Sequence, residues 1–187
     1  MLVKFPPVGN DKEAFYFIID HLKRQDCKAM SSEGGGFGCR YRVEEFRNVS
    51  KCAIGALISV HEYTDHLEDQ SVQFGGEVYD AIDSSNPDWR ITENSVEMLL
   101  ALQRLHDEVE VKDWSWLFSI IDQAIEEFGF ERVVYSQKYS RSALYSMVSM
   151  AQNHIRDGSD SRVGEWNFSE TTMEWFSDKR EKAMAIA

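Results

Sequence analysis

GCRYRVEEFRNVSKCAIGALI, residues 38–58, is the stretch of this chain that decides the expected fold. It holds Cys39 and Cys52, two arginines on either side of Tyr41, and the most apolar short run in the first third of the sequence. Residues 38–43 alternate between polar and apolar side chains, which predicts a strand. Residues 51–59 form a short apolar run that suits a strand and a buried helix equally, so both remain open. The stretch therefore predicts a small β element near residues 38–58.

The sequence on either side of this stretch has helical periodicity. Asn10 is suited to cap a helix with Glu13 three residues on, and the apolar spacing that follows predicts a helix over 11–24. Further helices are predicted at 77–82, after Thr92, after Asp113 with a stop at Gly129, after Ser140 and after Ser169. Residues 133–135 are predicted as a short strand. The expected fold class is mainly α (α+β), dominated by helices.

One domain is expected over residues 1–187, because the chain is long enough to bury a core and no repeat or long linker divides it. Residues 1–10 are predicted as an extended lead-in, since a residue before proline is disfavoured in helical geometry and the segment contains Pro6 and Pro7. Three successive glycines at 34–36 predict a flexible loop. Residues 131–187 are predicted as a C-terminal extension.

The core is predicted from the apolar positions that share a helical period. The residues expected to be buried are Leu99, Leu100, Leu102, Leu117, Ile120, Ile121 and Ile125, with Ile54, Leu57 and Ile58 from the central stretch. The first three belong to a helix that is apolar over a wide arc, which predicts a central place in the core.

Composition narrows the class of protein. Apolar residues make up 43% of the chain and charged residues 28%, as in ordinary globular proteins. The apolar runs are far shorter than a membrane span, and the first residues lack the basic-then-apolar layout of a secretory signal. Three cysteines make a disulfide framework unexpected, so a reducing cytoplasm is the expected location.

Charge is distributed unevenly along the chain. Residues 60–130 contain seventeen acidic and three basic side chains, whereas the flanking segments are close to neutral. This field repels phosphate backbones, so direct nucleic-acid binding is not expected. It attracts a basic protein instead, although a solvated acidic surface has the same composition. The candidate acidic interface consists of Glu62, Asp65, Glu68, Asp69, Glu108 and Glu110.

Three motifs together resemble a known family. C-x-Y-R stands at 39–42, K-C-A-x-G-x-L-I at 51–58 and L-x-x-L-Q-x-x-H-D at 99–107, with Tyr63, Glu68 and Trp116 at matching places. Over about residues 14–130 the chain resembles uncharacterised proteins of tailed phages and prophages. It departs from them after Ile58, where relatives continue with Pro-Asp and this chain has Ser59 and Val60. The resemblance implies a phage or prophage setting and no particular activity.

The residues with chemical potential in these motifs are Cys39, Arg40, Tyr41, Arg42, Cys52, His106 and Asp107. Zinc sites present cysteines as close pairs, and Cys39 and Cys52 stand thirteen positions apart, so both are expected to be reduced, buried and free of metal. A nucleophilic pairing of either cysteine with His106 stays open, because such partners are distant in sequence. No cofactor and no metal are predicted.

Aromatic pairs outside these motifs point to contacts with other molecules. Trp114 with Trp116, Trp166 with Phe168, and Trp175 with Phe176 cannot all face one helix core, so some are expected at a surface or interface. Self-association is one such contact. The sequence therefore favours a phage- or prophage-encoded accessory protein that binds and modulates a host protein carrying a basic patch, such as a component of host defence. The alternative is a small cysteine- and histidine-based enzyme, with or without a metal.

Overall fold

The computed structural model describes residues 7–31, 38–45, 48–68, 70–135 and 142–156. These residues form two compact units, one within residues 1–111 and the other within residues 112–187. The prediction of a single domain over 1–187 stays a prediction, because two compact units can still unfold as one cooperative domain.

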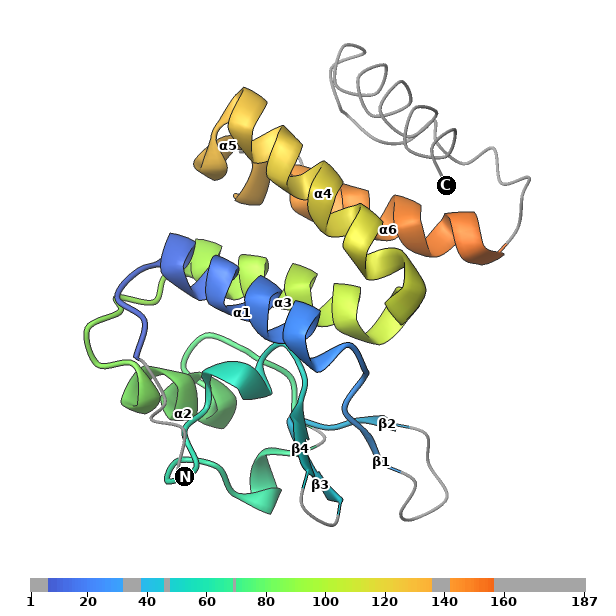
Figure 1. The fold of residues 1–187 in the computed structure, drawn as a ribbon. Coiled ribbons are helices and arrows are strands. Elements are labelled where there is room, and N and C mark those ends of the chain that lie inside the picture. Colours follow the sequence, from blue (N-terminus) through green and yellow to red (C-terminus); the bar gives the residue numbers. More distant parts are fainter. Residues whose placement is uncertain (1–6, 32–37, 46–47, 69, 136–141, 157–187) are drawn as a thin grey trace. The chain divides into compact units, whose positions relative to one another are not determined.

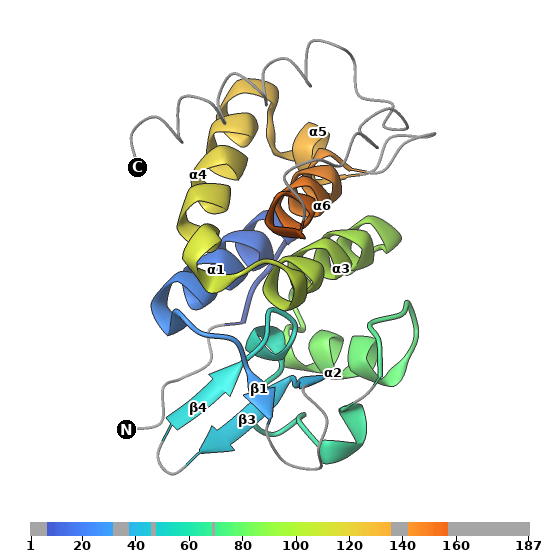
Figure 2. The same cartoon turned by 90° about the vertical axis from the view of Figure 1, so that its right-hand side faces the viewer.

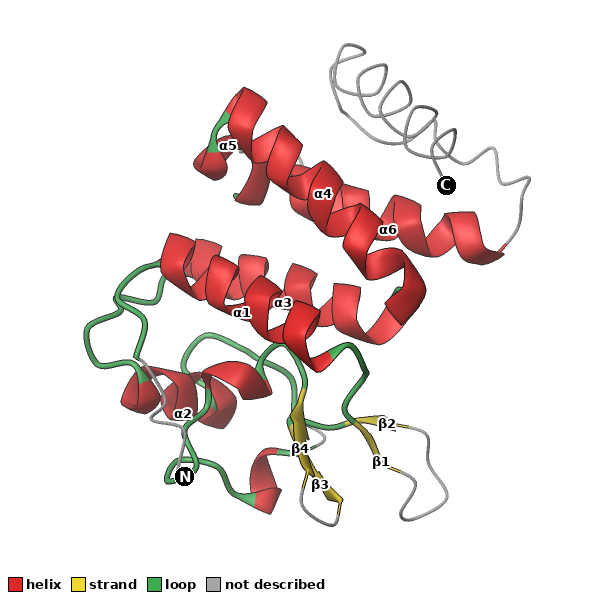
Figure 3. Ribbon diagram, in the orientation of Figure 1, coloured by secondary structure: helices red, strands yellow, loops and turns green. Residues whose placement is uncertain are grey.

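The first unit combines three helices with short strands (Figures 1 and 3). Its elements in chain order are α1 (Asp11–Gln25), β1 (Met30–Ser31), β2 (Gly38–Cys39), β3 (Arg42–Glu45), β4 (Asn48–Lys51), the 3₁₀ turns η2 (Gly55–Leu57) and η3 (Asp65–Leu67), α2 (Glu77–Ser85) and α3 (Glu93–Glu108). The second unit contains the helices α4 (Val111–Phe128), α5 (Phe130–Val134) and α6 (Ala143–Arg156). Among the described residues, helices dominate and strands are few, which confirms the helix-dominated α+β class.

The strands of the first unit form two antiparallel pairs. In the β3–β4 hairpin, drawn as arrows in Figure 2, Arg42 lies opposite Lys51. In the shorter pair, Met30 of β1 lies opposite Cys39 of β2. The small β element near residues 38–58 is confirmed. For residues 51–59 the sequence left a strand and a buried helix open, and the structure shows part of each. Lys51 ends a strand, and residues 55–57 form a 3₁₀ turn.

Local capping explains where the main helices begin and end. The Asn10 side chain accepts a hydrogen bond from the Glu13 amide, and Thr92 caps α3 in a reciprocal pair with Ser95. Gly129 adopts a positive φ of 87° and stops α4, as predicted.

Two sequence predictions about helices of the second unit are wrong. Helix α4 begins at Val111, and Asp113 lies in its first turn, where a carboxylate also interacts favourably with the positive end of the helix dipole. Residues 130–134 form the helix α5, although 133–135 were predicted as a strand. Val133 and Val134 are buried, and α5 packs on α6, so tertiary burial outweighs the β propensity of valine. The helix predicted after Ser140 is confirmed as α6, although Ser140 itself lies outside the described residues. The helix predicted after Ser169 and the loop at 34–36 lie outside the described residues.

The core of the first unit forms where α1 packs against α3 and η2. Helix α1 contributes its buried face, made of Ala14, Phe15, Ile18, Ile19 and Leu22. All the predicted core residues are buried except Leu100, whose side chain is 41% exposed. Leu100 lies on the exposed side of α3 with Glu97, one turn away, so the apolar arc of this helix was read too widely.

Gly55 fixes how closely the segment around Tyr41 approaches η2. A Cβ atom at this position would lie 1.8 Å from the carbonyl oxygen of Tyr41. Only glycine fits there without moving backbone, so the 39–41 segment lies directly against the turn that follows Cys52. Within the described ranges, no helix combines the length and the apolar character that crossing a membrane requires.

Candidate functional site

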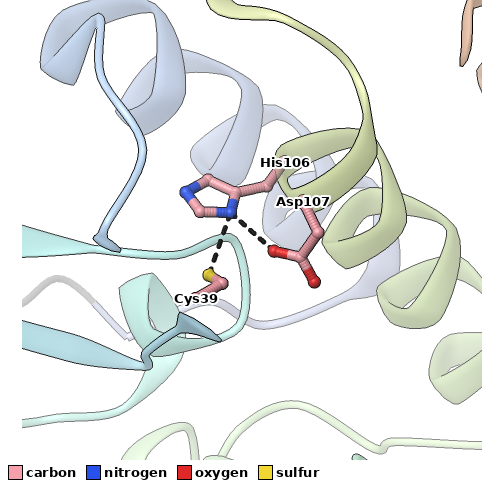
Figure 4. Close-up of side chains that lie close together, drawn as sticks. All are labelled: Cys39, His106 and Asp107. Carbon is pink, nitrogen blue, oxygen red and sulfur yellow. Dashed lines mark hydrogen bonds and ion pairs between the residues drawn. The ribbon is translucent and has the colours of Figure 1, made fainter. Parts of the chain in front are cut away.

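Cys39, His106 and Asp107 come together in the first unit (Figure 4). Cys39 ends β2, and the other two residues lie in the last turn of α3. The His106 Nδ1 atom lies 3.2 Å from the Cys39 sulfur and 2.9 Å from Asp107 Oδ1. Among the described residues, this is the group of three whose sulfur, nitrogen and carboxylate atoms converge, all within 4.8 Å of one another.

Gln103 supports this cluster from one turn earlier on α3. Its side-chain amide donates hydrogen bonds to both carboxylate oxygens of Asp107, at 2.8 and 3.0 Å, and to the Cys39 sulfur at 3.5 Å. Its carbonyl oxygen accepts a hydrogen bond from the Ile54 amide. Gln103 was missed as a functional candidate, although its spacing from His106 and Asp107 places all three on one helix face.

The backbone amide of Ala29, just before β1, determines the tautomer of His106. The amide next to the start of β1, at Ala29, donates to His106 Nε2 at 3.2 Å, so Nε2 presents a lone pair. The ring proton is therefore assigned to Nδ1, which donates to Asp107 and faces the Cys39 sulfur. Because both the Ala29 amide and the His106 side chain are fully buried, leaving that amide unpaired would cost about 1–3 kcal/mol.

The pKa values of the three residues are shifted by their mutual contacts. A hydrogen bond with Cys52 and burial raise the pKa of the Cys39 thiol well above its usual range, against a smaller lowering by His106. Burial raises the pKa of Asp107, but hydrogen bonds with His106, Cys39 and Gln103 lower it by more. Burial lowers the pKa of His106, but Asp107 and Cys39 raise it by more, while the Ala29 amide favours the neutral ring.

These contacts limit what the cluster can do as a nucleophilic site. A thiol held in its protonated form is a poor nucleophile. In a nucleophile–base–orienter arrangement, the acid contacts the ring nitrogen that the thiol does not use. Here Asp107 and Cys39 both face Nδ1, and Nε2 belongs to the Ala29 amide. The three side chains therefore converge as the ligands of a metal ion would, but they are not arranged in the sequence that passes a proton from thiol to imidazole to carboxylate.

The other two cysteines lie in different surroundings. Cys52 is buried, as predicted, and its sulfur accepts a hydrogen bond from the Gly55 amide at 3.3 Å. Cys39 was predicted to be buried and is only half-buried, next to Asp107, whose side chain is 37% exposed. Cys27 is exposed. All three are free thiols.

The arginine–tyrosine motif of the candidate cluster contacts a different part of the unit. Arg40 is exposed, and its amide donates to the carbonyl of Ala29. The Tyr41 hydroxyl donates to the carbonyl of Gln70. Arg42 pairs with Glu44 and lies 5.5 Å from the centre of the Tyr63 ring. Apart from the Arg40 amide, these contacts tie the hairpin to the 63–70 segment.

One member of the predicted acidic interface is an internal structural group. The Glu68 carboxylate accepts hydrogen bonds from the amides of Tyr41 and Arg42 and from the Tyr63 hydroxyl, at 2.8–3.2 Å. Because its carboxylate oxygens already accept these internal hydrogen bonds, Glu68 is poorly placed to bind a basic group of a partner. Glu62, Asp65 and Glu110 are exposed, Glu108 is exposed and paired with Arg104, and Asp69 lies outside the described residues.

The aromatic pairs predicted at a surface are only partly described. Trp114 is buried, with its ring 6.3 Å from that of Phe118, and Trp116 is half-buried. The pairs at 166 and 168 and at 175 and 176 lie outside the described residues. The structure instead exposes Phe74, 56% accessible, which no periodicity in the sequence singled out.

Comparison of this chain with protein-family models, with curated proteins and with solved structures finds no match.

Proposed function

We propose that this protein binds and modulates another protein that carries a basic patch. The observation that carries this proposal is a surface of the first unit made of Phe74, Glu77, Tyr79, Asp80 and Asp83, called here the acidic-aromatic surface. Phe74 is the most exposed large apolar side chain among the described residues. An aromatic ring left in water next to carboxylates is suited to contact a cationic partner.

The acidic-aromatic surface is built around helix α2. The ring of Phe74, just before the helix, lies 4.9 Å from that of Tyr79 at a tilted angle of 53°. Asp80 and Asp83 follow Tyr79 on α2, Asp83 one turn further along the helix, and after burial their negative charges raise the pKa of Tyr79. Glu77 accepts a hydrogen bond from Gln70 at 2.9 Å and lies 3.3 Å from His66.

Two physical contributions favour a basic partner here. Burying a phenylalanine side chain contributes about 1.5–3 kcal/mol, and a cation held over an exposed aromatic ring adds about 0.5–1 kcal/mol. The acidic surplus of residues 60–130, including the exposed Glu62 and Asp65, speeds association with a basic protein. Self-association through the same surface is opposed by this charge.

The resemblance to tailed-phage and prophage proteins supports a setting for this binding. We infer an accessory protein that acts in the cytoplasm of the host cell on a host protein, such as a component of host defence. No nucleic acid is expected to bind directly, because the chain carries a net charge of −12.

The test is capture of partners from the host cell with the tagged full chain and three variants. Phe74→Ser and the double reversal Asp80→Lys with Asp83→Lys should each reduce recovery of the partner, while Glu93→Lys with Glu97→Lys, exposed on α3, is the matched charge control. Binding to the recovered partner should weaken as salt rises, because charges beyond about 8 Å are screened at physiological ionic strength. Equal recovery by all variants would overturn the proposal.

The convergence of Cys39 and His106 keeps the thiol enzyme as a second candidate. A catalytic Cys39 must react with iodoacetamide faster than the exposed Cys27, whereas the raised pKa of Cys39 leads us to expect the opposite order. The rates are measured by mass spectrometry of peptides after timed alkylation of the folded protein. Faster alkylation of Cys39 would favour the enzyme.

A further inference from the structure

The cluster of Cys39, His106 and Asp107 contains three different metal-binding atoms at one place. Cys39 and His106 are 67 positions apart in the sequence, so no short sequence motif contains all three residues. We infer that the Cys39 sulfur, the His106 Nδ1 atom and the Asp107 carboxylate together bind a zinc ion. The inference does not depend on the partner-binding proposal, because it concerns a different group of residues.

The spacing of the three atoms suits zinc. Zinc bonds to sulfur, nitrogen and oxygen are about 2.0–2.3 Å long, so tetrahedral ligand atoms lie roughly 3.3–3.6 Å apart. The nitrogen lies 3.2 Å from the sulfur and 2.9 Å from Oδ1. The sulfur and the Asp107 carboxylate lie within 4.8 Å of each other, so adjustments of these side chains would bring the three atoms to tetrahedral spacing.

The surroundings of the cluster also suit a metal. Gln103 donates to both oxygens of Asp107 and is itself held by the Ile54 amide, as a group that orients a ligand should be. The nearby cation, Lys28, donates to the backbone carbonyl of Asp107 and leaves the carboxylate to the ion. Asp107 is partly exposed, so water can reach the fourth position.

Cys52 is a neighbour of the site and no ligand in this proposal. Its thiol forms a hydrogen bond with Cys39, and its sulfur also accepts the Gly55 amide, but it does not belong to the converging group. The proposed set is therefore one thiolate, one imidazole and one carboxylate, and the exposed Cys27, replaced by serine, is the control outside the cluster.

Binding moves two protons, and one of them gives a structural signature. The Cys39 thiol loses its proton to solvent as the sulfur bonds to zinc. The ring proton of His106 shifts from Nδ1 to Nε2, because Nδ1 must present a lone pair to the ion. Nε2–H then faces the Ala29 amide, which is also a donor, so this amide has to turn away from the ring.

The experiment uses the full chain and titrates zinc against a chromophoric chelator. We expect one zinc per chain, at least about a tenfold loss of affinity in Cys39→Ser and Asp107→Asn, and less than about a twofold change in Cys27→Ser, because Cys27 is exposed and lies outside the cluster. Cobalt(II) added to the wild-type protein should give a sulfur-to-cobalt charge-transfer band, which reports the thiolate directly even if a variant fails to fold. The Ala29 amide resonance should shift when zinc is added.

Two results would overturn the inference. The first is a folded wild-type protein that binds less than stoichiometric zinc or gives no thiolate band with cobalt. The second is zinc affinity unchanged in folded Cys39→Ser, which would place the ion elsewhere. In either case the cluster is a hydrogen-bonded network that joins β1 and β2 to α3.

Discussion

Replacing Gly55 by alanine should destabilise the first unit more than most surface or loop substitutions would. The added Cβ would lie 1.8 Å from the Tyr41 carbonyl oxygen, 2.6 Å from its carbon and 2.9 Å from Tyr41 Cα. All three are backbone atoms, so no side-chain rotation relieves the clash, and either segment has to move by more than about 1 Å. Inserting atoms into a packed interior typically costs about 1–3 kcal/mol and occasionally more, and a backbone clash belongs at the upper end, so we expect about 3 kcal/mol.

The assay is urea unfolding followed by circular dichroism and tryptophan fluorescence, with Gly76→Ala as the matched control. A Cβ at Gly76 would approach the carbonyl oxygen of Gln73 only to 3.3 Å, so a change below about 1 kcal/mol is expected there. The Gly55 amide donates to the Cys52 sulfur, and the clash in Gly55→Ala has to shift this backbone, so the substitution should speed alkylation of Cys39 and Cys52. An unfolding free energy of Gly55→Ala within about 0.5 kcal/mol of wild type would refute the reasoning.

Three further predictions follow from single contacts. Leu99→Ala should lower the free energy of unfolding by about 2–5 kcal/mol, and Leu100→Ala on the same helix by less than about 0.5 kcal/mol, because Leu99 is 1% and Leu100 41% exposed. Equal losses of unfolding free energy in urea would contradict this packing. Glu68→Gln should cost about 1–3 kcal/mol by replacing a charged acceptor of three hydrogen bonds, whereas Glu62→Gln, exposed, should change the melting temperature little. Burial and the charge of Arg42 lower the pKa of Lys51 to about 8, below its ordinary 10.5, so between these values the unfolded chain binds more protons and stability should rise with pH. The difference in unfolding free energy between wild type and Lys51→Met, measured at pH 7.5 and 10, isolates this effect; a difference independent of pH would exclude it.

The elements that the sequence predicted correctly depend on interactions between near neighbours in the chain. The Asn10 and Thr92 caps act over three residues, and the Gly129 stop follows from its own φ. The buried face of α1 repeats at helical spacing within 15 residues. Such signals survive in a single sequence because the physical partners are a few positions apart.

The errors occurred where distant parts of the chain decide the outcome. Residues 133 and 134 have β-branched side chains that locally favour a strand, and packing of α5 on α6 makes them helical. Glu68 is a charged residue type that is usually exposed, so the sequence predicts it at the surface. In the structure its carboxylate instead accepts hydrogen bonds from the amides of Tyr41 and Arg42, which are distant in sequence.

By itself, the sequence determined the helix-dominated α+β class, the position of the β element and most of the core. Periodicity and capping depend on residues within one helix or strand, so a single sequence shows them. The candidate residues Cys39, His106 and Asp107 were also visible in it as residue types. Only the tertiary structure decided that they meet, that Gln103 and the Ala29 amide complete their contacts, and that Arg40, Tyr41 and Arg42 do not join them. The physical reason is that the contact between β2 and the last turn of α3 joins residues distant in sequence, so it depends on how α1 packs against α3 and η2 in the folded unit.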